Sequence, residues 1–333
     1  MVLLGAPALR RYADPVRSAT QTENQSKVRR LRPYRAVPRI TAHARPQGNR
    51  RGTYKERANG QNSRAISLRG VNTAPVGIFD SGVGGLSVLR EIRAAMPAES
   101  IDYVADSANA PWGDKPPGFV RDRALFISGF LVEQGIKAVV IGSNTGTAGS
   151  AEALRSTLAI PVVGIEPGIK PAVAATRSRV IGAIVPAAVS ESDRLASLLD
   201  RFGGDVKVIV QPVPGLVEHV EQADLDSGEL RQMVEGYLRP MLDAGADAIV
   251  LGSTHYVFLK PLVAEIAGPN VTLIETGAAV ARQLARVLDE RGLRANGQSG
   301  VERFWTSGNP TVSRRVISAL LGREVWVEKL PDG

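Results

Sequence analysis

From residue 75 onward, short apolar runs alternate with longer segments whose apolar residues recur at helical spacing. The first unit, "PVGIFDSGVGGLSVLREIRAAMP", reads as an apolar strand, a glycine-rich turn and a helix over 87–96. Strands alternating with helices predict an α/β fold of parallel sheets covered on both faces. Further strands are predicted at 100–106, 137–143, 160–166, 180–185, 206–212, 247–253 and 271–275, with helices at 119–134, 168–176, 227–244, 277–291 and 312–321.

The sequence contains an internal repeat. "EQGIKAVVIGSN" (133–144) and "DAGADAIVLGST" (243–254) agree at five positions with a constant offset of 110, including Ser143 and Ser253. The agreement continues past each strand into polar residues, where packing alone does not require it. We therefore predict two pseudo-symmetric domains, each a parallel sheet flanked by helices that presents one serine at a strand tip: 73–168 plus 277–333, and 169–276.

Charge separates the N-terminal segment from the rest. Residues 1–70 hold 16 Lys and Arg against 3 Asp and Glu, whereas the remainder holds 25 against 30, so the basic character belongs to the N-terminal segment. That segment has no sustained apolar period, and we predict a disordered basic tail over 1–72. Three interpretations stay open: an organellar transit peptide, a non-specific nucleic-acid arm, or a reading frame begun upstream of a true start near Val71.

The composition and the hydropathy exclude several kinds of protein. The chain holds no cysteine and only His43, His219 and His255, so neither a disulfide nor a structural zinc site is expected. No apolar run approaches the ~20 residues of a membrane span, and the start lacks a secretory signal, so a cytoplasmic protein is predicted.

The two serines suggest a two-sided site. If the halves face each other, their hydroxyls approach one small ligand from opposite sides. Inverting an α-carbon requires such an arrangement, because a base on one face removes a proton and an acid on the other returns one.

Five blocks carry a resemblance in order and spacing. "GIFDSGVGGLSVL", "YVADSANAPWGDK", "AVVIGSNTGTA", "VVGIEPG" and "AIVLGSTHY" resemble the motifs of the bacterial glutamate racemases, over roughly residues 75–290. The resemblance implies two α/β domains, cofactor-independent interconversion of L- and D-glutamate, and supply of D-glutamate to peptidoglycan. A glutamate-like amino dicarboxylate is the substrate it implies, and a homodimer is a further expectation.

The resemblance also implies the roles of single residues. Ser143 and Ser253 stand where the family has its two catalytic cysteines; Asp80 supports the first, and Glu221 and His255 assist the second. The substrate contacts it implies are Asp80, Ser81, Pro111, Trp112, Gly113, Asn144, Thr145 and Thr254.

Departures from the family pattern bear on activity. A serine hydroxyl is a far weaker acid than a thiol of pKa ~8.5, so it needs a strong neighbouring base. The family's threonines, which hold the substrate carboxylate, are replaced by "VPAAV" at 185–189, and Val257 replaces a proline. Two function classes follow. The first is an enzyme: a cofactor-independent racemase, or a relative that uses the same site, with Ser253, His255 and Asp80, for easier proton chemistry. The second is a racemase-like pseudoenzyme that binds an amino acid or a protein. An engineered cysteine-free racemase is a third, disfavoured by the altered 185–189 loop.

Each candidate also has a structural interpretation. The serines could bond turn amides after their strands, His255 could be a satisfied buried imidazole, and Asp80 could accept amide hydrogens at the start of helix 87–96. "DSGVGG" could cradle a phosphate, although it lacks the Lys and Ser/Thr of a P-loop and the spacing of a dinucleotide site.

Overall fold

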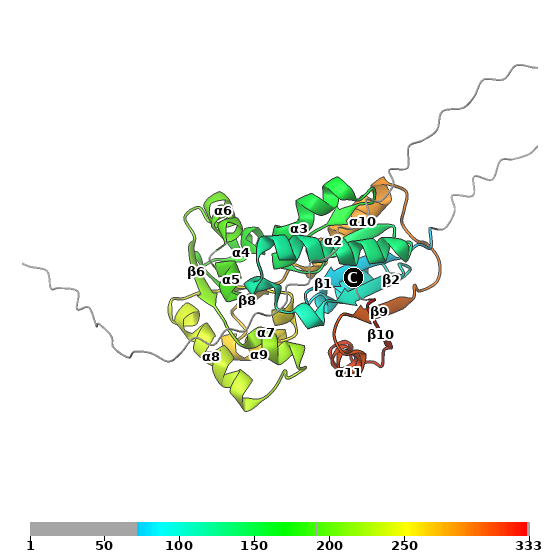
Figure 1. The fold of residues 1–333 in the computed structure, drawn as a ribbon. Coiled ribbons are helices and arrows are strands. Elements are labelled where there is room, and N and C mark those ends of the chain that lie inside the picture. The colour runs from blue at the N-terminus through cyan, green and yellow to red at the C-terminus, as the bar shows by residue number, and fades with distance from the viewer. Residues whose placement is uncertain (1–71, 191, 332–333) are drawn as a thin grey trace, which may run out of the picture. The chain divides into compact units, whose positions relative to one another are not determined.

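The computed structural model describes residues 72–190 and 192–331 (Figure 1). The predicted tail therefore lies, except for residue 72, outside the described residues. Two parallel sheets flanked by helices make up the described chain, as predicted. We call the first sheet with its helices the first half, and the second sheet with its helices the second half.

The first sheet has the strand order β10-β9-β2-β1-β3-β4, and the second has the order β6-β5-β7-β8. All described strand pairs are parallel. The C-terminal strands β9 and β10 extend the first sheet beyond β2. The strands are β1 (Val76–Asp80), β2 (Ile101–Ala105), β3 (Ala138–Ile141), β4 (Val162–Val163), β5 (Val180–Val185), β6 (Lys207–Pro212), β7 (Ala248–Leu251), β8 (Thr272–Ile274), β9 (Glu302–Thr306) and β10 (Val327–Lys329).

The repeat found in the sequence is a repeat of structure. The order β2-β1-β3-β4 corresponds to β6-β5-β7-β8. Gly135 and Gly245, which precede β3 and β7, both have φ +84°, a conformation that glycine adopts without steric cost. After the strands, the Gly142 amide donates to Phe79 O at 2.7 Å and the Gly252 amide donates to Ile184 O at 2.8 Å. The two serines thus follow equivalent strands of the two sheets.

Alternation along the buried strands explains why both faces of each sheet are covered. In β1, Ile78 packs in the core that contains α1, α10 and α11, while its neighbour Phe79 packs in the core with α2 and α3. In the second sheet, α7, α8 and α9 pack on one face and α4 and α6 on the other. This layering leaves the strand ends as the place for a site.

The helices agree with the predicted ones where apolar spacing is regular. Five helices, α3, α5, α6, α7 and α9, were not predicted. Between residues 72 and 331, leaving out residue 191, no helix is both long and apolar enough to cross a bilayer. The helices are α1 (Leu86–Ala95), α2 (Pro117–Glu133), α3 (Asn144–Thr157), α4 (Ile169–Ala175), α5 (Ala187–Ser190), α6 (Asp193–Phe202), α7 (Leu216–Glu221), α8 (Gly228–Asp243), α9 (Lys260–Ala267), α10 (Gly277–Glu290) and α11 (Pro310–Leu321).

Candidate active site

A cavity of about 200 Å³ lies at the carboxyl ends of the strands. Six loops line it: those after β1, β2 and β3 in the first half, and those after β5, β6 and β7 in the second. These strands are equivalent in pairs, so the two halves offer matching edges to one space. A cavity of this size is smaller than the roughly 300–1,000 Å³ of drug-sized ligand sites and suits a small metabolite.

The cavity gathers nearly all the residues singled out from the sequence. Glu221 is the exception, because it lies behind His255 and bonds to it instead of lining the space. The predicted residues that line the cavity are Asp80, Ser81, Pro111, Trp112, Gly113, Ser143, Asn144, Thr145, Ser253, Thr254 and His255.

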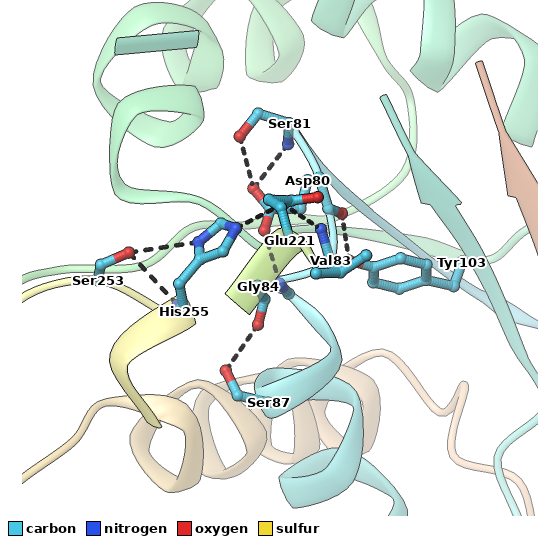
Figure 2. A network of polar contacts seen from close by, with 11 residues as sticks. Asp80, Ser81, Val83, Gly84, Ser87, Tyr103, Glu221, Ser253 and His255 are labelled. Atoms are coloured by element: carbon cyan, nitrogen blue, oxygen red, sulfur yellow. Dashed lines mark hydrogen bonds and ion pairs between the residues drawn. The ribbon is translucent and has the colours of Figure 1, made fainter. Parts of the chain in front are cut away.

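The glycine-rich turn after β1 holds a carboxylate of the protein itself. The Val83 amide donates to Glu221 Oε1 at 2.8 Å (Figure 2). A Cβ at Gly82 would lie 1.8 Å from the same oxygen, and one at Gly84 would lie 2.3 Å from His255 Nδ1. The glycines are needed because the second half lies against the turn. Since Glu221 takes the place of an external anion, the phosphate-cradle interpretation is not supported.

His255 links Ser253 to Glu221. Its Nε2 lies 2.6 Å from Glu221 Oε1, and its Nδ1 lies 3.4 Å from Ser253 Oγ (Figure 2). Burial by itself would lower the pKa of His255, but the hydrogen bond and charge of Glu221, with the charges of Asp80 and Glu218, raise it above its ordinary value. The raised pKa means that His255 keeps its proton to a higher pH than an ordinary histidine, with Glu221 as the partner of Nε2.

Asp80 is held by the backbone of the turn that follows it. Oδ1 accepts from the Ser81 amide and Oδ2 from the Gly85 amide, both at 2.6 Å. Gly85 precedes α1, so Asp80 does bond at the start of that helix, as the structural interpretation expected. Burial raises the pKa of Asp80; the charge of His255 opposes this rise and the charge of Glu221 adds to it. Asp80 is thus a buried carboxyl at the wall of the cavity.

Ser143 and Asn144 connect strand β3, the cavity and the second half. Ser143 caps α3, and its Oγ accepts from the Gly146 amide at 3.1 Å. Asn144 Nδ2 donates across the cavity edge to Gly252 O at 3.0 Å. The capping bond uses a lone pair of Ser143 Oγ and leaves its hydrogen free to face a ligand.

Several lining residues were not singled out from the sequence. Asp114 and Glu218 lie exposed at the rim, and an apolar segment follows β6. The rule that ligands bind at the carboxyl ends of parallel strands would have found the loop after β6, because the strand itself was predicted. Within the described part of the chain, no three His, Asp or Glu side chains are grouped to hold a metal ion.

Comparisons with known proteins agree with this geometry. Residues 84–284 match the Asp/Glu/Hydantoin racemase family. The glutamate racemase of Pseudomonas paraeruginosa is 50% identical over 259 residues, which cover 78% of this chain and 98% of that protein. The chain belongs to the glutamate racemase family.

Solved structures of glutamate racemases share the fold. An isoform from Bacillus anthracis superposes with a TM-score of 0.71 at 30% identity, over 78% of this chain and 98% of the other. The Escherichia coli racemase, in complex with L-glutamate and the activator UDP-MurNAc-Ala, gives a TM-score of 0.69 at 28% identity, over 77% and 98%. The family resemblance predicted from five sequence blocks is therefore confirmed.

Proposed function

We propose that this protein binds glutamate in the cavity and interconverts its L and D forms without a cofactor. The observation that carries the proposal is the two-sided cavity, to which equivalent strands of the two halves each bring a serine hydroxyl. Racemisation needs a proton acceptor on one face of Cα and a donor on the other. The predicted use of the product, in peptidoglycan, follows from the family resemblance.

The bound amino acid is oriented by charge and by amide hydrogens. Its ammonium group faces the buried Asp80 carboxylate. Its α-carboxylate faces Asn144 and Thr145 at the N-terminus of α3, where the helix dipole favours an anion. Thr254 contributes from the other half. This orientation leaves the Cα hydrogen between the two serines.

Each serine has a neighbour that can carry its proton. Ser253 contacts His255, which Glu221 holds in place. For Ser143 we assign this role to Asp80, whose Cβ lies 3.6 Å from the ideal Cβ position of the preceding residue, Gly142. In the D-to-L or L-to-D direction, one side takes the Cα proton and the opposite side donates one to the carbanion. Turnover is slow, because a serine hydroxyl ionises far less readily than a thiol.

The test compares the full chain with its Ser143→Cys/Ser253→Cys variant. Racemisation of L- and D-glutamate is followed by optical rotation. We expect slow turnover by the unmodified protein and a rate at least ~10²-fold higher for the double variant, the lower end of what acid–base groups contribute. Ser128→Cys is the matched control, because it adds a buried thiol in α2 outside the cavity.

The binding-module alternative gives a different result. Glutamate binding without racemisation by either protein would favour a racemase-like pseudoenzyme, and no binding by either would refute the proposal. A homodimer, and nucleic-acid binding through the basic tail, remain predictions from the sequence.

A further inference from the structure

Apart from Glu218 at the rim, the side chains that the loops after β5 and β6 bring to the cavity are apolar. They form a wall that faces the polar residues of the first half, which include Asp80, Ser143 and Asn144. We call it the apolar wall. Its members are Pro186, Ala187, Ala188, Val189, Val213, Pro214 and Val217.

The apolar wall offers no side-chain partner to a second carboxylate. None of its members carries a hydroxyl, amide or charged group. Among the described residues that line the cavity there is no lysine or arginine, and the acidic side chains Asp114 and Glu218 lie at its rim. A carboxylate on the ligand's side chain would meet like charges there, and like charges near each other are unfavourable.

The amino-acid head group is bound elsewhere in the cavity. Its ammonium and α-carboxylate are proposed to face Asp80 and the start of α3. The side chain then extends toward the apolar wall, on the side where that wall contacts the loop after β2: a Cβ at Gly113 would lie 3.3 Å from Ala188 Cβ. Apolar groups in this space are removed from water against Ala188 and its neighbours, which is favourable.

We propose that the cavity accepts α-amino acids with uncharged side chains as well as glutamate. The proposal rests on the proposed function, because it places the head group as described there. The apolar wall accepts the side chain of the bound amino acid if it fits the space and its apolar groups leave water. It does not select for a carboxylate at the end of that side chain. Glutamine and norvaline, which approach glutamate in length, are the probes that isolate the charge.

Calorimetric titration of the full chain with L-glutamate, L-glutamine and L-norvaline tests the proposal. We expect glutamine and norvaline to bind with dissociation constants within about threefold of that of glutamate, or tighter. Binding of glutamate more than about tenfold tighter than both would overturn the proposal.

Variants of the apolar wall add a second readout. Ala187→Thr/Ala188→Thr introduces hydroxyl donors into the cavity and should shift the glutamate-to-norvaline affinity ratio toward glutamate by about fivefold or more. Ala196→Thr is the matched control, because Ala196 is exposed on α6 outside the cavity. An equal ratio in the double variant and the control would count against the wall as the determinant.

Binding and turnover are measured separately, so the two proposals fail differently. Selective binding of glutamate would refute the specificity inference and leave the proposed function standing. Binding of all three amino acids without racemisation would refute the proposed activity and support the inference. If none of the three binds, both are refuted.

Discussion

Gly82→Ala should destabilise the protein although it adds only a methyl group. The new Cβ would lie 1.8 Å from Glu221 Oε1 and 2.6 Å from Glu221 Cδ, so the Glu221 side chain must leave its place. Oε1 accepts from the Val83 amide and contacts His255 Nε2, and both interactions would be lost. Two hydrogen bonds to a charged group at about 1.5 kcal/mol each give a loss of about 3 kcal/mol.

Urea unfolding followed by circular dichroism measures this loss. Gly129→Ala is the matched control, because a Cβ at Gly129 in α2 meets nothing within 4 Å. Both changes restrict the unfolded chain in the same way, so their difference reports the folded state. The control should be stabilised by about 0.5–1 kcal/mol. Equal unfolding free energies for the two variants would refute the account of why the turn needs glycine.

Two further predictions concern buried charges. The pKa of His255 is raised in the folded state, so protonation of His255 stabilises the fold. This contribution to the unfolding free energy is fully present below the unfolded pKa of ~6.5 and is lost as pH rises through the folded pKa. In the Glu221→Gln variant, the urea midpoint should depend less on pH when it is measured from acidic to basic pH. An unchanged pH dependence would contradict the assignment of Glu221 as the group that raises the pKa of His255. Lys137→Met should cost about 3–5 kcal/mol of unfolding free energy, because Lys137 Nζ lies 2.5 Å from Glu99 Oε2 and both side chains are buried. In the same assay, Arg121→Ala is the control, because it breaks an exposed ion pair with Asp122 and should leave the urea midpoint unchanged. Equal losses of unfolding free energy for Lys137→Met and Arg121→Ala would contradict the prediction.

Much of the fold could be predicted because its strands are buried and its main helices are amphipathic. The run 138–141 is apolar throughout and lies between two neighbours in the sheet, so its pattern is unmistakable. Helix α3 was missed because it begins directly after β3 and contains Gly146 and Gly149, which weaken a helical pattern. Its start is fixed by the Ser143 cap and by packing on α2, which depend on tertiary structure.

The candidate site, like the fold, could be predicted only in part from the sequence. Residues in continuous blocks, such as Ser143 to Thr145, could be predicted because each block ends a strand. Asp114 and Glu218 could not be assigned to the cavity in advance, because their side chains reach its rim only when the two sheets face each other. The contact of Glu221 with Val83 likewise joins residues 138 positions apart.

Exchange of the Cα hydrogen of glutamate in D₂O tests the central claim most directly. The full chain is incubated with L-glutamate, and deuterium at Cα and the amount of D-glutamate are measured by NMR and chiral chromatography. The account predicts slow deuterium incorporation accompanied by D-glutamate, and faster incorporation by the Ser143→Cys/Ser253→Cys variant. Saturating glutamate that acquires no deuterium with the unmodified protein would contradict the claim that the two serine-bearing halves move a proton.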